Sequence, residues 1–167
     1  MTKALATLAV LACGALAAAG CGGGGSSTAS ESESGGAAGA TTTLAPEVAV
    51  VTATTTPKLG RAIVEKKGMT LYDFHKDKGT TSACYGACAK VWPPLLTEGK
   101  PVAGEGASAA KLGVAKRRDG TEQVTYAGHP LYTYVEDTKP GETNGNDTSS
   151  FGAQWYALSP SGEELGG

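Results

Sequence analysis

Two ten-residue segments hold most of the side chains in this sequence that could do chemistry. GMTLYDFHKD spans residues 68–77, and GHPLYTYVED spans residues 128–137. In each segment a Leu-Tyr pair is followed by a second aromatic residue and, three positions later, by an Asp. Carboxylates are oxygen ligands for cations and serve as acids or bases in catalysis. The motif residues are therefore the first candidates for a site: Tyr72, Phe74 and Asp77, then Tyr132, Tyr134 and Asp137.

An architectural role explains the repeated motif most simply. Residues two apart on a strand share a face, so Tyr72 and Phe74 point one way while Leu71 points the other. Each aromatic side chain can remove about 150–250 Å² from water, and Trp92 and Trp155 would add to the same core. An Asp in a turn-like context accepts backbone N–H bonds and fixes the exit of the strand.

A shared binding site is the alternative. If an internal pseudo-twofold axis relates the repeats, Asp77 and Asp137 could face each other and bind a cation, together with Asp73 and His75. Asp73, His75 and Asp77 alternate, which places them on one face of a strand. The second copy offers further oxygen ligands: Asn144, Asn146 and Asp147. No loop has the spacing of a known calcium site. The leading prediction therefore includes neither a metal nor a cofactor.

Cys84 and Cys88 form a Cys-x-x-x-Cys pair in the segment SACYGACAKVW. Helical positions four apart bring Cα atoms to about 6 Å, which is within the range of a disulfide. The spacing is wrong for c-type haem, and a second pair for a structural zinc site is missing. The sequence predicts a disulfide, with a redox-active pair and a copper thiolate site as alternatives.

Catalytic motifs are missing from the sequence. There is no Gly-rich phosphate loop, no Gly-x-Ser-x-Gly and no His-Glu-x-x-His. Neither His75 nor His129 has a visible Ser or Cys nucleophile as its partner. The net charge is −2 without a basic stripe, which argues against nucleic acid as a partner. The sequence therefore favours a protein that is not an enzyme.

The elements that must position these residues are mostly strands. Residues 47–53 are rich in Val and predict a first strand. Residues 60–74 predict a hairpin that turns at Lys67-Gly68. Residues 113–135 predict a three-stranded meander, with turns at Asp119-Gly120 and at 127–130. QWYAL, residues 154–158, predicts the last strand, closed by a turn at 159–162.

One short helix is predicted at residues 82–92. Ser82 is suited to be its N-cap, and Pro93-Pro94 must end it. The small residues of 95–113 predict a surface loop.

The duplication extends beyond the motif. Each copy begins with Lys-Leu-Gly and ends with a Trp, giving units of about 58–95 and 111–158. One unit alone is too small to fold stably, so both should share a core. The sequence therefore predicts a mainly β fold, a small antiparallel domain of two related hairpin or meander repeats with one short helix.

The N-terminus predicts export and lipid attachment. Residues 1–20 contain one cation and an apolar run that is too short for a spanning helix, as in a signal peptide. Small residues precede Cys21, as at a bacterial lipoprotein processing site. Residues 21–45 then form a lipidated Cys and a disordered tether, because Gly, Ser and Thr cannot bury enough apolar surface. The folded domain is expected at 46–167.

Four segments together resemble the bacterial secreted-repeat lipoproteins, a family of unknown function with a Tyr-x-(Phe/Trp/Tyr)-x-x-Asp motif. They are LYDFHKD, SACYGACAKVWPPL, TYAGHPLYTYVEDTKPGETNG and WYAL. Both motif copies fit the pattern. The resemblance implies an exported, often lipid-anchored domain of two repeats, and it supplies no activity.

These observations predict an extracytoplasmic protein anchored to the bacterial membrane through lipid on Cys21. The leading hypothesis is a non-enzymatic module that binds an envelope ligand or protein partner of unknown identity. The alternatives are a redox or electron-transfer accessory using the two later cysteines and a metal-binding protein using the acidic ends of the motifs.

Overall fold

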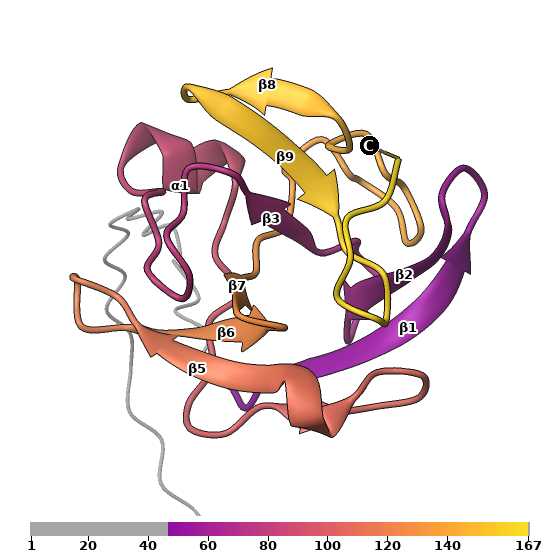
Figure 1. Cartoon of the computed structure of the whole chain (residues 1–167), viewed down its shortest axis with the longest axis horizontal. Coiled ribbons are helices and arrows are strands. Elements are labelled where there is room, and N and C mark those ends of the chain that lie inside the picture. The colour runs from indigo at the N-terminus through magenta and orange to yellow at the C-terminus, as the bar shows by residue number, and fades with distance from the viewer. Residues whose placement is uncertain (1–46, 167) are drawn as a thin grey trace, which may run out of the picture. The chain divides into compact units, whose positions relative to one another are not determined.

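The computed structural model describes residues 47–166, and the arrangement of this domain is shown in Figure 1. The predicted signal peptide at 1–20, the lipidated Cys21 and the tether to residue 45 lie outside the described residues. Within residues 47–166, no helix has the length and apolar character needed to cross a membrane.

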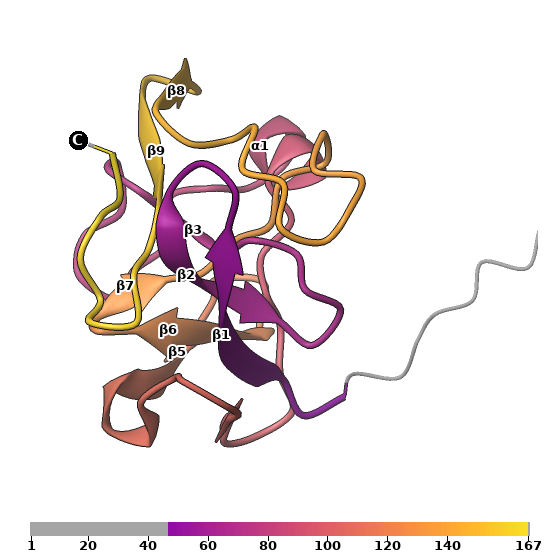
Figure 2. The ribbon, with the colours of Figure 1, turned by 90° about the vertical axis from the view of Figure 1, so that its right-hand side faces the viewer.

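Three small sheets make up the domain, which confirms the mainly β fold. In Figure 2 β8 and β9 lie at the top, β5, β6 and β7 at the bottom, and β1 and β2 between them in the view. The first sheet has the order β2-β1-β4, the second β3-β9-β8 and the third β5-β6-β7. All pairings are antiparallel except that of β1 with β4. The strands are β1 Val50–Thr56, β2 Gly60–Glu65, β3 Tyr72–Phe74, β4 Val102–Ala103, β5 Leu112–Lys116, β6 Glu122–Tyr126, β7 His129–Pro130, β8 Thr148–Ser150 and β9 Ala153–Ala157.

The first hairpin differs from the predicted one. β2 pairs along its length with β1, in a register from Val51 opposite Glu65 to Thr56 opposite Gly60. The turn at 66–68 does return the chain, but only as far as a bridge between Val64 and Thr70. Beyond it, β3 leaves β2 and pairs with β9, because its aromatic residues pack against those of the second repeat.

The second half follows the sequence prediction more closely. β5 and β6 form a hairpin around Gly120, whose φ of +88° suits the left-handed turn that Gly readily adopts. β9 ends in the predicted turn, where Gly162 N–H donates to the Ser159 carbonyl. The third strand of the meander is only His129–Pro130, and residues 131–135 make single bridges rather than a continuous strand.

The helix is shorter than predicted, and its cap is different. α1 spans Ala87–Val91, and its N-cap is Gly86 with φ +59°. This left-handed residue separates 82–85 from the helix. The hydroxyl of Ser82 instead accepts the Cys84 N–H. The predicted disulfide between Cys84 and Cys88 is present and bridges the break. The predicted 95–113 loop also contains β4 and a 3₁₀ turn, Ala109–Lys111.

An internal pseudo-twofold axis relates the backbone hydrogen bonds of the two repeats. At the axis, Tyr72 and Tyr132 donate their N–H groups to each other's carbonyls at 2.9 and 3.0 Å. Away from the axis, backbone hydrogen bonds between the repeats have symmetry-related counterparts. Ile63 donates its N–H to the Leu158 carbonyl, and Val124 correspondingly donates to Leu95. His75 donates to the Gln154 carbonyl, and Val135 correspondingly donates to Val91. Each repeat thus completes the other, which explains why a single unit would not suffice.

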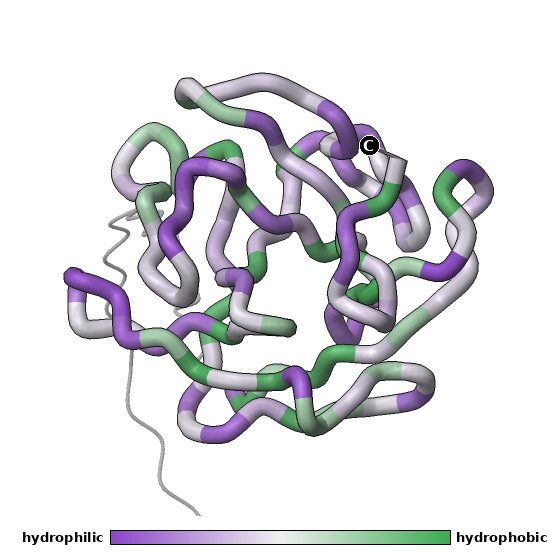
Figure 3. Tube along the Cα trace, viewed as in Figure 1, coloured by the Kyte–Doolittle hydropathy of each residue, from purple (hydrophilic) through white to green (hydrophobic). Residues whose placement is uncertain are grey.

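The motif segments separate two hydrophobic clusters. Leu71 and Leu131 lie in one cluster, while Tyr72 and Tyr132 lie in the other. This confirms the predicted alternation of faces. Apolar and hydrophilic stretches accordingly alternate along the chain trace in Figure 3. Both clusters take residues from both repeats, so the shared core consists of two parts.

Four aromatic rings stack across the pseudo-twofold axis. Trp92 and Trp155 lie at its centre, with ring centroids 3.9 Å apart and planes 1° from parallel. Phe74 of the first repeat covers Trp155 at 3.9 Å, and Tyr134 of the second covers Trp92 at 4.2 Å. The aromatic residues of the motif therefore form the centre of the fold, as the architectural interpretation predicts.

Candidate functional site

The two motif Asp residues do not share a site. Asp77 and Asp137 lie in the walls of different pockets. Each carboxylate instead accepts a hydroxyl from the other repeat: Tyr72 donates to Asp137 at 2.5 Å and Tyr132 donates to Asp77 at 2.7 Å. Each also accepts a backbone N–H from its own loop, from Ala83 or Asn144. The Tyr and Asp of the motif thus form a reciprocal lock between the repeats.

The lock holds its groups in defined protonation states. Burial raises the pKa of both Asp77 and Asp137, and the hydrogen bonds that they accept lower it. Burial and the neighbouring carboxylate raise the pKa of both Tyr72 and Tyr132. The tyrosines therefore stay neutral donors to the carboxylates.

Tyr72→Phe is expected to lower the free energy of unfolding by about 1.5–3 kcal/mol, the typical contribution of a hydrogen bond to a charged group. Asp137, 4 % exposed, would keep the Asn144 N–H but lose its hydroxyl partner. Tyr134→Phe is the matched control, because it installs the residue found at position 74, and it should change the stability by less than about 0.5 kcal/mol. Urea unfolding measures both variants. Equal effects would contradict the lock.

A separate pocket of about 410 Å³ gathers ionisable side chains from distant parts of the chain. Asp73 lies on β3 and His75 directly after it, while His129 begins β7. Glu164 comes from the C-terminal segment that follows β9. Asp77 also lines the pocket. Three carboxylates and two imidazoles therefore line this pocket.

Asp73 occupies the buried side of this pocket. It is 2 % exposed, and its Oδ1 has no hydrogen-bond partner among the described residues. Its Oδ2 lies 3.1 Å from Nδ1 of His129. Burial and the neighbouring Glu164 raise the pKa of Asp73, both His129 and His75 lower it, and the result is a pKa of about 6. A buried carboxylate oxygen without a partner costs stability, which is typical of a functional site.

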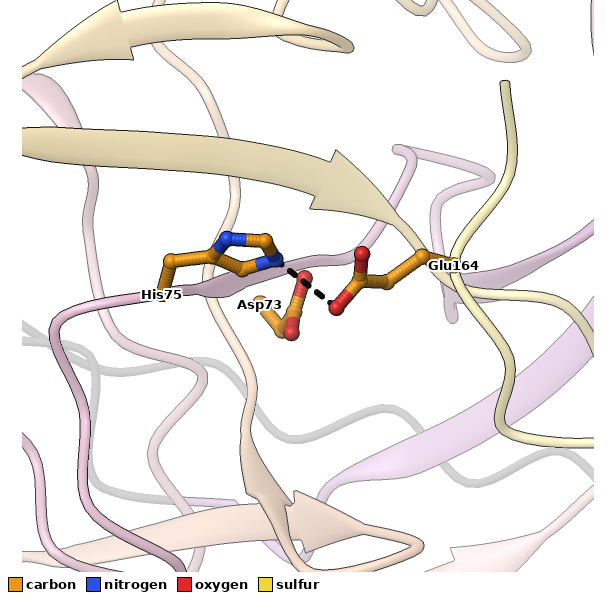
Figure 4. Close-up of side chains that lie close together, drawn as sticks. All are labelled: Asp73, His75 and Glu164. Atoms are coloured by element: carbon orange, nitrogen blue, oxygen red, sulfur yellow. Dashed lines mark hydrogen bonds and ion pairs between the residues drawn. The ribbon is translucent and has the colours of Figure 1, made fainter. Parts of the chain in front are cut away.

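The outer side of the pocket is formed by His75 and Glu164. Their Nε2 and Oε1 atoms are 2.8 Å apart, and their side chains are 39 % and 35 % exposed. In Figure 4 the His75 ring and the two carboxylates, including that of Asp73, converge on one another. One ligand atom from each of the three residues lies within 4.8 Å of the other two.

The pseudo-twofold axis provides an internal comparison for this pocket. It relates Asp73 to Thr133, His75 to Val135 and, through the same turn position, His129 to Met69. Those three residues line the equivalent pocket of about 330 Å³. The pocket formed by Met69, Thr133 and Val135 shows that the fold does not need ionisable side chains at these positions. We therefore infer that Asp73, His75 and His129 serve a purpose other than folding.

Sequence reasoning identified only part of this cluster. The sequence offers Asp73 and His75 as possible ligands together with Asp77, and all three do line one pocket. The expected partner Asp137 and the residues Asn144, Asn146 and Asp147 do not line it. The sequence assigns no role to His129, and it does not indicate Glu164, because no local pattern connects that residue with His75. Comparing the two motif copies position by position would have singled out Asp73 and His75.

The disulfide is placed in the core rather than in a pocket. Cys84 is fully buried and Cys88 is 7 % exposed. Both pack in the cluster that contains Trp92 and Trp155. Thiol exchange requires access for an attacking thiolate, so this burial argues against the redox alternative.

Comparison with known proteins gives one match. The sequence model of a family described as a secreted repeat of unknown function matches residues 53–96 and 113–159. The two matches coincide with the two repeats that the pseudo-twofold axis relates. No curated protein and no solved structure matches the chain.

Proposed function

Because the chain belongs to the family of secreted repeats of unknown function, we propose that it is an extracytoplasmic, lipid-tethered module that captures a positively charged ligand without chemical conversion. The family description supports a location outside the cytoplasm. The single observation that carries the binding proposal is the buried Oδ1 of Asp73, which has no hydrogen-bond partner within residues 47–166 and lies in a pocket lined by three carboxylates.

The residues that both repeats share and those found only in the first repeat have different roles, and this difference supports the proposal. The motif residues that both repeats possess form the core and the Tyr–Asp lock, and they are engaged with one another. Asp73 and His75, which only the first repeat possesses, line the pocket instead, and among the described residues Oδ1 of Asp73 has no hydrogen-bond partner. Because a folded ligand site on rigid elements needs little reorganisation, such a domain is suited to capture.

The tether is the second part of the proposal. A lipid on Cys21 would hold the protein at the membrane, and a Gly- and Ser-rich segment of 25 residues would span on the order of 25–30 Å. The domain would then meet solutes beyond the lipid headgroups. Binding and anchoring would reside in separate parts of the chain.

One experiment tests both parts by comparing the full chain with its Cys21→Ser variant. The wild type is expected to incorporate labelled fatty acid and to sediment with membranes, and the variant to do neither. Both proteins are then titrated with Ca²⁺, Zn²⁺ and spermidine, and NMR follows the rings of His75 and His129. We expect at least one cation to shift these signals with the same dissociation constant in both proteins.

Two results would contradict the proposal separately. Fatty-acid label that persists in Cys21→Ser would refute the anchor. If no cation shifts the ring signals of either His75 or His129, the pocket is not a cation site and the binding proposal fails.

A further inference from the structure

We propose that the pocket over Asp73 binds one divalent transition-metal ion, with Asp73, His75 and Glu164 as its protein ligands. This inference rests on the proposed function and names the ligand of that site. It rests on three ligand atoms that the fold brings close together from two segments. His75 and Glu164, one from each segment, are 89 residues apart in the sequence.

The distances suit a small ion. Zn²⁺ binds nitrogen and oxygen ligands at about 2.0–2.2 Å, which places ligand atoms of a tetrahedral site about 3.3 Å apart. The three atoms here already lie within 4.8 Å of one another, and the His75–Glu164 contact of 2.8 Å would open slightly. Both side chains are partly exposed, so rotation about their own torsions suffices, and the backbone can remain in place.

Asp73 supplies the observation that points to a missing partner. Its carboxylate is buried, and its Oδ1 accepts no hydrogen bond from the described residues. Oδ2 of the same carboxylate lies 3.1 Å from Nδ1 of His129. Groups beside a metal-bound carboxylate commonly orient it. His129 is therefore a positioning residue that leaves the other oxygen of Asp73 for the ion.

The composition of the ligand set favours transition metals over the hard cations. Ca²⁺ takes six to eight oxygens, and Mg²⁺ demands an octahedron of oxygens. One imidazole with two carboxylates suits Zn²⁺, Mn²⁺ or Fe²⁺ instead. Three protein ligands leave a coordination position for water, as in sites where the ion is accessible from solvent. Such a site fits reversible capture better than a structural role.

The second repeat provides the variants for the test. Asp73→Thr and His75→Val install the residues of the equivalent positions 133 and 135, so neither variant should disturb the fold. Glu164→Gln changes a residue of the C-terminal segment that is partly exposed. Glu163→Gln is the matched control, because the Glu163 carboxylate accepts a hydrogen bond from the Ser161 hydroxyl and does not line the pocket.

The full chain and each variant are titrated with Zn²⁺ by calorimetry, after chelation of any bound metal. We expect one Zn²⁺ per chain for the wild type and for Glu163→Gln. Each of the three ligand variants should bind at least about 100-fold more weakly, because loss of a ligand exceeds the 10–100-fold effect of an outer-shell change. Co²⁺ should give visible d–d absorption in the wild type that the ligand variants lose.

The role of His129 has its own readout. His129→Met installs the residue found at position 69 and should weaken Zn²⁺ binding about 10–100-fold. The Co²⁺ spectrum at saturation should keep the band positions of the wild type, because the ligands are unchanged. A shifted spectrum would instead make His129 a ligand and overturn its positioning role.

The outcomes separate this inference from the proposed function. If Ca²⁺ or spermidine shifts the pocket histidines and Zn²⁺ does not, the pocket takes cations but the metal assignment is wrong. If Zn²⁺ binds all variants with equal affinity, it binds elsewhere and the inference is overturned. If no cation binds at all, both proposals fail.

Discussion

Trp155→Ala is expected to lower the free energy of unfolding by about 3–5 kcal/mol, the usual range for removing a buried Trp side chain. Trp155 is fully buried, and its ring lies between those of Phe74 and Trp92, each 3.9 Å away. Tyr132 also meets it edge-on at 5.2 Å. The substitution therefore removes the contact between the repeats as well as apolar area. Small domains are stable by only about 5–15 kcal/mol, so much of the total would be lost.

Urea unfolding followed by far-UV circular dichroism measures this loss without relying on Trp fluorescence. Phe151→Ala is the matched control, because Phe151 lies in the turn between β8 and β9, four residues from Trp155, but is 39 % exposed. It should change the stability by less than about 1 kcal/mol. Trp92→Ala should resemble Trp155→Ala, and the double variant should cost less than the sum, because the rings contact each other. A loss below about 1 kcal/mol for Trp155→Ala would show that the stack does not hold the repeats together.

Asp73→Asn is expected to stabilise the metal-free protein at neutral pH. The pKa of Asp73 is raised to about 6 by burial, from an ordinary value of 3.8. Below about pH 3 this carboxyl is neutral in both the folded and the unfolded chain, so it costs nothing. Above about pH 7 it is ionised in both, and the ionised group is disfavoured in the folded state by about 3 kcal/mol. Its cost therefore appears as the pH rises between these two values.

The measurement is the difference in unfolding free energy between Asp73→Asn and the wild type, from about pH 3 to about pH 7 with chelator present. This difference should grow in favour of the variant by about 3 kcal/mol over that window, because Asn does not ionise. Glu47→Gln is the control, because the exposed partner Lys66 lowers the pKa of the Glu47 carboxyl, whereas burial raises that of Asp73. A difference that is constant with pH, or one that falls, would contradict the claim that ionisation of the buried Asp73 destabilises the folded protein.

These two expectations describe opposite roles within one repeated fold. The residues that both repeats share stabilise the fold, as Trp155 does through the ring stack. Asp73, which only the first repeat has, is expected to destabilise it. Proteins commonly tolerate such local costs where a ligand is bound. The contrast between equivalent positions of the repeats therefore locates the site.

The sequence determined the elements that depend on local chemistry. Alternating apolar residues predicted most strands, Asp119-Gly120 predicted the β5–β6 turn, and Pro93 marked the end of the helix. The repetition of the motif predicted two units that share a core. The four-residue spacing of Cys84 and Cys88 predicted their disulfide. Apart from the repeat, which is found by comparing its two copies, the residues that decide each of these structures are near one another in the chain, so their periodicity, spacing or turn preference is sufficient.

The tertiary structure decided which distant groups meet. The sequence could not show that β3 pairs with β9 instead of β2, because either strand offers a suitable face. It could not show that Tyr72 bonds Asp137, 65 residues away, and that the two Asp residues are thereby kept apart. Nor could it bring Glu164 to His75. Such pairings follow from the interlocking of two repeats around stacked rings, and that packing is a property of the whole domain.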